Sequence, residues 1–142
     1  MKFEKSCGCV VLNDKQQVLL VHHNLGHWGL PKGHVEKDET EVETAKREVK
    51  EETNIDVEVN SNYRYSMSYS PKEGIMKEVV FFVANSVSNN LKEQVEEVQE
   101  VKWFDFDDAI NAITYDNSKE LLRKVKFDLQ KRNPLFIELL QL

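Results

Sequence analysis

The chain has 142 residues, a formal net charge of -6 and a pI near 5.3. This length suits one domain with a substantial core, so we expect a single domain over residues 1–142. The acidic charge argues against long nucleic acid as a partner, because such tracts are held by Lys and Arg. A small polyphosphate bound through a metal ion stays compatible with it. No apolar run approaches membrane-spanning length and the start lacks a secretory pattern, so we expect a cytoplasmic protein without membrane contact.

The first part of the chain predicts a β-hairpin. Residues 6–12 and 16–22 are apolar runs rich in strand-forming residues. Asn13 and Asp14 lie between them, and such residues favour a tight connection between strands. We therefore expect two neighbouring antiparallel strands at the start of the fold.

Two cysteines lie in the first of these strands. Cys7 and Cys9 are two residues apart, so their side chains point to the same face. In a cytoplasmic protein we expect buried, reduced thiols rather than a disulfide. A zinc site that adds His22 and His23 is the alternative interpretation.

A helix is predicted from about residue 39 or 40 to residue 53. Val42, Ala45 and Val49 recur there at the spacing of one apolar stripe. The stripe indicates a helix that packs one face against the core.

The remainder of the chain predicts further strands and two more helices. Extended segments are expected at 55–69, 75–85 and 98–104, the first two joined by a turn at 71–74. A short helix capped by Asp105 or Asp107 should run to about residue 113, and a longer one capped by Asn117 or Ser118 to about residue 131. Strands interleaved with three helices indicate the α/β class, with a mixed sheet between helices.

Three carboxylates gather near the end of the first predicted helix. Glu48, Glu51 and Glu52 fall within one arc of its surface, where their charges repel. The last turn carries the negative end of the helix dipole, so this cluster is unfavourable unless a cation joins it. Carboxylate oxygens suit Mg²⁺ or Mn²⁺, which often recruit substrate phosphates as well. The alternative is a solvated acidic face.

The spacing around this helix resembles the Nudix box. Five residues separate Gly33 from Glu39, seven separate Glu39 from Arg47, and the run continues as REVKEETNI. The pattern G-x5-E-x7-R-E-U-x-E-E-x-G-U, with U aliphatic, is matched at every defined position except that Asn54 stands where the family has glycine. Asparagine tolerates positive φ, so we expect the turn after the helix to survive.

The resemblance implies a Nudix hydrolase with an α/β/α sandwich, a mixed central sheet and the Nudix loop-helix-loop. It carries over Glu48, Glu51 and Glu52 as metal ligands together with the backbone carbonyl of Gly33. In the family such metals bridge substrate phosphates while water attacks phosphorus. Glu48 and Glu52 are both candidates for the general base.

Two further positions follow from the box. Arg47 and Glu39 match the family's structural pair, in which Arg47 would orient the acidic cluster; as isolated residues they would form an ordinary surface salt bridge. Asp38 replaces a glycine common in the family, and Asp also tolerates a left-handed turn.

The stretch HWGLPKGHVE at 27–36 narrows the range of possible substrates. It resembles H-W-x-x-P-K-G-H-V-E of asymmetrical diadenosine tetraphosphate hydrolases, a Nudix branch that cuts dinucleoside polyphosphates into a nucleoside triphosphate and a monophosphate. His27 and Lys32 could bind phosphate oxygens. Trp28 is either a core residue, which we favour, or a stacking surface.

Other candidate residues lie later in the chain. Lys77 and Tyr115 stand where this branch has a lysine before an aromatic strand and an adenine-stacking tyrosine. Tyr69 is a candidate second wall of that clamp, because aromatic faces accept purines. Ordinary packing is the alternative for both tyrosines.

A glutamate outside the box completes the metal site or serves as base in this branch. Glu97, in EEVQEVKWF, is the matching residue, and Glu96 and Glu100 are rivals.

The site residues leave several functions open. The interpretation we favour is asymmetrical cleavage of diadenosine tetraphosphate to ATP and AMP. The alternatives are hydrolysis of ADP-ribose, of an oxidised nucleoside triphosphate or of an RNA 5′-end triphosphate, and, from a different class, a noncatalytic nucleotide sensor. The protein could be a monomer or a homodimer, and the apolar segment 134–142 could close the core or contact a second subunit.

Overall fold

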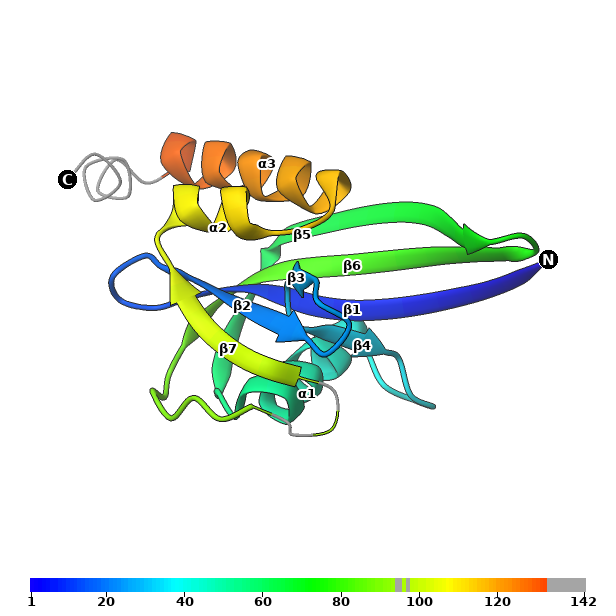
Figure 1. Ribbon diagram of the computed structural model, residues 1–142, viewed down its shortest axis with the longest axis horizontal. Coiled ribbons are helices and arrows are strands. Elements are labelled where there is room, and N and C mark those ends of the chain that lie inside the picture. Colours follow the sequence, from blue (N-terminus) through cyan, green and yellow to red (C-terminus); the bar gives the residue numbers. More distant parts are fainter. Residues whose placement is uncertain (94–95, 97, 133–142) are drawn as a thin grey trace.

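A curled sheet with helices on both faces forms the molecule in the computed structural model, which describes residues 1–93, 96 and 98–132. Helix α1 (Glu41–Thr53) covers one face, and helices α2 (Phe106–Ala112) and α3 (Asp116–Arg132) cover the other (Figure 1). The α/β class and the predicted mixed sheet between helices are confirmed. The segment 134–142 lies outside the described residues.

The sheet mixes parallel and antiparallel pairs. Its order is β3-β2-β1-β6-β5, with β4 paired to β1 and β7 paired to β2. The β1–β6 pair is parallel and the other pairs are antiparallel. The strands are β1 (Lys2–Leu12), β2 (Val18–His23), β3 (Trp28–Gly29), β4 (Lys32–His34), β5 (Val57–Lys72), β6 (Ile75–Ser86) and β7 (Val98–Phe104).

The predicted hairpin is present, and Leu12 pairs with Val18 at its closed end. The Asn13 side chain accepts hydrogen bonds from the backbone N–H groups of Lys15 and Gln17, at 3.0 and 2.9 Å. These bonds satisfy the turn locally, as expected for asparagine. The Asn13 side chain thereby shapes the connection that the sequence predicted.

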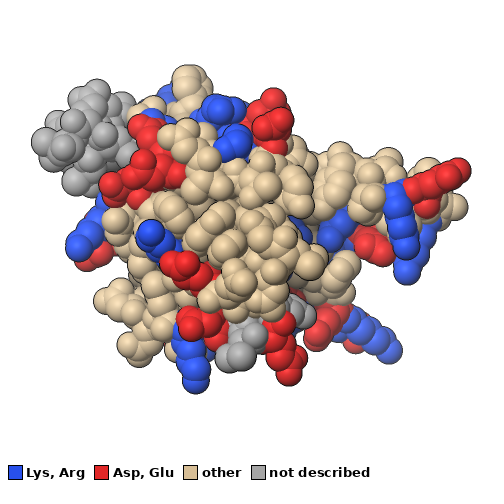
Figure 2. Space-filling view, in the orientation of Figure 1, with Lys and Arg blue, Asp and Glu red and all other residues tan. Residues whose placement is uncertain are grey.

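Strand β1 begins four residues earlier than predicted. Its first residues pair with the start of β6, from Lys2 opposite Ile75 onward. With β5 they form an arm that projects beyond the helices, and the N-terminus lies at its tip (Figure 1). Charged side chains gather on this arm and around the rim of the same face, whereas the centre over β2 and β3 is mainly uncharged (Figure 2).

The segment between β2 and α1, for which no strand was predicted, contains the strands β3 and β4. Both are short: β3 pairs with β2 across the turn at 24–27, and β4 pairs with the more distant β1. Gly8 of β1 permits the approach, because a Cβ there would lie 2.1 Å from the Pro31 carbonyl oxygen. The pairing, and not a local pattern, makes these residues extended.

Two apolar clusters form the core, one on each face of the sheet. Alternate residues of β1 divide between them: Val10 and Leu12 face α2 and α3, while Cys9 and Val11 face α1. This is the period-two alternation of a strand buried on both faces. The sheet is therefore a rigid base for residues that project from its edges and loops.

Cys7 and Cys9 are free thiols, fully buried in the cluster beneath α1. Burial raises the pKa of Cys7 to about 11 and that of Cys9 to about 12, so both are protonated at neutral pH. The predicted buried thiols are confirmed. Within residues 1–93, 96 and 98–132 they form no zinc site with His22 and His23.

The two later helices lie close to their predicted bounds. Asp105 is the N-cap of α2, although its side chain makes no capping hydrogen bond, and α3 begins at Asp116, just before the predicted caps. No helix in the described part of the chain is both long and apolar enough to cross a membrane.

Candidate active site

Helix α1 is fixed at both ends by its own sequence. Thr40 is the N-cap and forms a capping box with Glu43, at 3.1 and 3.0 Å. At the other end Asn54 has φ 65°, and its backbone N–H donates to the Lys50 carbonyl at 2.9 Å. Asparagine thus performs the left-handed capping that the Nudix box assigns to glycine.

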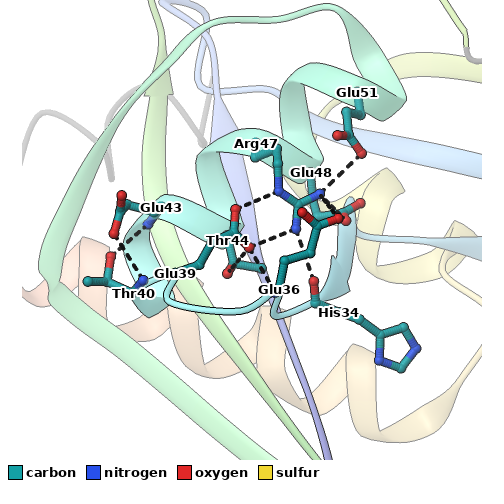
Figure 3. Close-up of polar contacts among 9 residues, drawn as sticks. All are labelled: His34, Glu36, Glu39, Thr40, Glu43, Thr44, Arg47, Glu48 and Glu51. Carbon is teal, nitrogen blue, oxygen red and sulfur yellow. Dashed lines mark hydrogen bonds and ion pairs between the residues drawn. The ribbon is translucent and has the colours of Figure 1, made fainter.

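Arg47 is the centre of the polar network on α1 (Figure 3). Its guanidinium donates to Glu39 at 2.6 and 2.9 Å and to the His34 carbonyl at 3.0 Å. It also donates to Glu48 at 2.7 Å and to Glu51 at 3.2 Å. One cation therefore ties the loop before α1 to two carboxylates of the predicted cluster.

Glu39 anchors the loop side of this network. Its carboxylate also accepts from the Glu36 backbone N–H and the Thr44 hydroxyl, each at 2.9 Å. The hydrogen bond from Arg47, followed by that from Glu36, lowers the pKa of Glu39 to about 2. The predicted Arg47–Glu39 pair is therefore part of a wider polar network than an ordinary surface salt bridge.

Gly33 and Glu48 touch across the loop and helix. A Cβ at residue 33 would lie 2.0 Å from the Glu48 carboxyl carbon, so only glycine fits without displacing this carboxylate. Burial raises the pKa of Glu48, against the opposing effect of Arg47. The Gly33 backbone is thereby held beside the Glu48 oxygens.

Glu52 is the buried member of the cluster, with 4% of its surface exposed. Its carboxylate accepts a hydrogen bond from the backbone N–H of Lys32 at 2.8 Å. This bond fixes β4 against the last turns of α1.

These residues match a hard divalent cation in donor chemistry. The predicted ligands are carboxylate oxygens beside a backbone segment, the oxygen donors that Mg²⁺ and Mn²⁺ favour. Within the described ranges, no three acidic, histidine or cysteine side chains form a group that could hold a metal ion. Glu48 and Glu51 instead face Arg47, and Glu52 faces the Lys32 N–H. Glu97, the predicted fourth carboxylate, lies outside the described residues.

A cavity of about 650 Å³ opens between β5 and the start of α3. Its lining includes four of the five residues predicted to bind substrate: His27, Lys32, Tyr69 and Tyr115. The fifth, Lys77, is not in the lining but pairs with Tyr69 across β5 and β6. The structure therefore brings together residues that the sequence spreads over nearly ninety positions.

Lys32 joins this cavity to the carboxylates. Its side chain lines the cavity, while its backbone N–H donates to Glu52. Burial lowers the pKa of Lys32, and the charge of Lys77 lowers it further. Lys32 therefore lies both in the cavity wall and against Glu52 of the box helix.

A row of rings forms one wall of the cavity. His23 stacks on His27 with centroids 4.3 Å apart, and His27 lies 5.6 Å from Tyr115. Burial lowers the pKa of His23 to about 4, with a smaller effect from His27, so its ring is neutral at physiological pH. From the sequence, His23 was predicted only as an alternative zinc ligand, and its place in this wall was not predicted.

Trp28 lies beside the wall but not in the cavity lining. It stacks on His22 at 4.5 Å, meets Phe104 edge-on at 5.1 Å and packs against the core. The favoured core interpretation of Trp28 is therefore confirmed.

Sequence reasoning also missed the residues that complete the cavity. Leu30, Met67, Val79 and Phe81 supply apolar surface, and the first turn of α3 supplies polar groups at 116–118. The period-two pattern of β5 and β6 could have indicated that Met67 and Phe81 share a face. No sequence signal placed the start of α3 opposite them.

Comparison with known proteins relates this chain to a family and to named relatives. The family model described as NUDIX domain matches residues 2–125. The chain is 36% identical over 128 residues to the asymmetrical bis(5'-nucleosyl)-tetraphosphatase of Caenorhabditis elegans, over 84% of this chain and 92% of that protein. It is also similar to the crystal structure of a C. elegans Ap4A hydrolase binary complex, with a TM-score of 0.80, 30% identity and coverage of 90% and 98% of the two chains.

A relative with a different named activity matches as well. The m7GpppN-mRNA hydrolase of Saccharomyces cerevisiae is 30% identical over 129 residues, which span 85% of this chain but 13% of that protein.

Proposed function

Because this chain belongs to the Nudix hydrolase family, we propose that it cleaves diadenosine tetraphosphate asymmetrically to ATP and AMP. Hydrolases of this family act on small nucleoside polyphosphates and generally use divalent metals such as Mg²⁺ or Mn²⁺. The proposal rests on the position of Lys32, whose side chain lines the cavity while its backbone holds Glu52. A phosphate chain that leaves the cavity past Lys32 reaches the carboxylates directly.

The nucleoside end of the substrate would occupy the aromatic part of the cavity. Tyr115 is 56% exposed, so its ring is available to a ligand. Tyr69 lines the same space, and burial raises the pKa of its hydroxyl, with the nearby Tyr115 as a smaller cause. Aromatic faces bind purines by stacking, which suits the adenine of this substrate.

The phosphates would lie among the basic residues. Lys32 and Lys77 supply positive charge, and His27 supplies a hydrogen-bonding ring at the cavity wall. Burial lowers the pKa of His27, so its neutral form donates one hydrogen bond without adding charge. These groups orient the chain of phosphates toward α1.

Hydrolysis replaces one bond with another at phosphorus. The oxygen of water bonds to the phosphorus, the bond to the bridging oxygen breaks, and the proton lost by water passes to a carboxylate. Glu48, Glu52 and Glu97 are the proposed bases, and all three are also proposed metal ligands together with Gly33 and Glu51. A divalent metal, when bound, neutralises phosphate charge and lowers the pKa of water. Arg47 orients the carboxylates of Glu48 and Glu51 through its hydrogen bonds to them.

A second candidate function is hydrolysis at the 5′ end of RNA, which the similarity to the m7GpppN-mRNA hydrolase favours. The acidic net charge of -6 argues against it, because long RNA is held by basic surface. ADP-ribose and oxidised nucleoside triphosphates would use the same carboxylates. A noncatalytic sensor is disfavoured because every box carboxylate is retained.

Product analysis tests these functions against one another. The purified protein is incubated with diadenosine tetraphosphate, ADP-ribose, 8-oxo-dGTP or triphosphorylated RNA, each with Mg²⁺ or Mn²⁺, and the products are separated by chromatography. ATP and AMP formed from the first substrate faster than any other conversion supports the proposal. If diadenosine tetraphosphate stays intact while another of the four substrates is cleaved, the substrate assignment is refuted but the assignment as a hydrolase stands. The Glu52→Gln variant controls for contaminating activity.

The cytoplasmic location, the single domain over 1–142 and the choice between monomer and homodimer stay predictions from the sequence.

A further inference from the structure

A second cavity, of about 330 Å³, lies between β5 and the C-terminal half of α3. It shares no lining residue with the cavity beside Lys32. Its lining is polar and aromatic: Asn62, Tyr63, Arg64, Tyr65, Lys124, Asp128, Lys131 and Arg132.

The lining is strongly basic for a chain with a net charge of -6. Three of its residues bring cationic side chains from α3, Lys124, Lys131 and Arg132, and one brings a carboxylate, Asp128. The Tyr65 hydroxyl donates to this carboxylate at 2.8 Å, and Lys124 lies 3.6 Å from it. The Asp128 carboxylate therefore already has partners among the lining residues, Tyr65 and Lys124.

The remaining cations are not all neutralised. The Arg64 guanidinium donates to Glu41 of α1, at 2.9 and 2.8 Å, so its charge lies on the opposite face of the sheet from α3. Lys131 and Arg132 form no ion pair with a carboxylate in the part of the chain that the structure describes, although Arg132 lies over the Tyr63 ring at 5.3 Å. The α3 side of the cavity thus carries an excess of positive charge.

We infer that this cavity binds the phosphate chain of a polyphosphate anion, at a site separate from the hydrolytic one. The Arg132 guanidinium and the ammonium groups of Lys124 and Lys131 can form short charge-assisted hydrogen bonds to phosphate oxygens. The volume accommodates a diphosphate or triphosphate. Nucleotides and inorganic polyphosphate share this chemistry and differ in whether a nucleoside is attached.

The position of the site connects it to the proposed substrate cavity. Both cavities lie between β5 and α3: residues up to 118 of α3 line the first, and residues from 124 line the second. Six residues of helix separate these positions by about 9 Å. A ligand at the second site would therefore contact the same helix whose first turn faces the substrate cavity.

Nuclear magnetic resonance of the ¹⁵N-labelled full chain tests the inference. Tripolyphosphate and, separately, ATP are titrated in the presence of a chelator, which prevents metal-dependent hydrolysis. We expect saturable shifts of the backbone amides at 62–65 and 124–132, weakened by added salt because the attraction is between charges. Tighter binding of ATP identifies a nucleotide as the ligand, whereas equal or tighter binding of tripolyphosphate identifies the inorganic chain.

Two matched double variants locate the binding. Lys131→Gln with Arg132→Gln should weaken binding at these amides about tenfold, since it removes two charged donors. Lys15→Gln with Arg123→Gln lowers the net charge by the same amount, but both residues lie outside the cavity lining. This control should change the affinity less than twofold. Single variants serve where a double variant does not give a folded spectrum.

Two results would overturn the inference: shifts confined to residues around Lys32 and Tyr115, or equal weakening by both double variants. Either result leaves the proposed hydrolysis untouched, because product analysis measures that activity independently of this cavity.

Discussion

The carboxylate side and the cavity side of the site are built in different ways. The carboxylate side comes from one continuous segment, residues 33–54, whose residues bond to one another through Arg47. The cavity side comes from the β2–β3 turn, β4, β5, β6 and the start of α3, which meet through packing. Chemistry that must be precise is thus held by local hydrogen bonds, whereas the surface that selects substrate is assembled from distant loops and strands. The following predictions test this division.

The largest expected effect is on turnover in Glu52→Gln. We expect turnover to fall by about two to four orders of magnitude, because the variant loses a carboxylate needed for metal and proton transfer. The amide can still accept from the Lys32 N–H, so the fold should persist. The melting temperature of the variant in the presence of chelator should be unchanged or slightly higher, because repulsion among the glutamates at the end of α1 is relieved. A sharp fall in melting temperature would contradict this account.

Gly33→Ala tests whether the close approach of the Gly33 backbone to Glu48 is needed, because it leaves every carboxylate of the box in the chain. The added Cβ would lie 2.0 Å from the Glu48 carboxyl carbon, so the helix or the loop must shift. We expect about a hundredfold loss of turnover and about 1–3 kcal/mol lower stability in urea unfolding.

Gly29→Ala is the matched control for this variant. Its Cβ would meet only the His23 ring, at 4.0 Å. We expect a stability close to that of the natural chain. Equal destabilisation by both alanines would show that the Gly33–Glu48 contact has no special role.

On the cavity side, Tyr115→Ala should raise the KM for diadenosine tetraphosphate about tenfold with little change in kcat. Loss of base stacking weakens binding, whereas the carboxylates are untouched. Tyr115→Phe keeps the ring and should resemble the natural chain in steady-state kinetics. An unchanged KM in the alanine variant would assign Tyr115 to packing alone.

The smallest effect concerns the acid stability of the Arg47 network. The folded pKa of Glu39 is about 2, below its ordinary value of 4.5, so this carboxylate stabilises the fold above about pH 4.5. The contribution is lost as pH falls toward 2. Arg47→Lys cannot form the two-pronged bond, so we expect its melting temperature to fall a few degrees at pH 7.

The difference between Arg47→Lys and the natural chain should shrink as pH is lowered from 4.5 to 2, which melting curves at several pH values measure. A constant difference over that range would show that the Glu39 pair does not stabilise the fold.

Particular elements show why some features were predictable. The bounds of β7 and α1 followed from apolar periodicity and caps, because those signals lie within a few residues of the element they define. The strands β3 and β4 were missed because their hydrogen bonds come from β2 and β1. His23 was missed as a cavity residue because its place depends on stacking with His27 across a turn.

The sequence by itself determined the family, the α/β class, the box helix with its caps and the set of candidate residues, because spacing along one helix fixes which side chains share a face. Tertiary structure alone decided that His27, Lys32, Tyr69 and Tyr115 line one cavity, that Lys32 bridges it to Glu52, and that a second basic cavity lies farther along α3. These arrangements depend on how β5 and α3 pack over the sheet, and packing between segments far apart in the chain leaves no local signal.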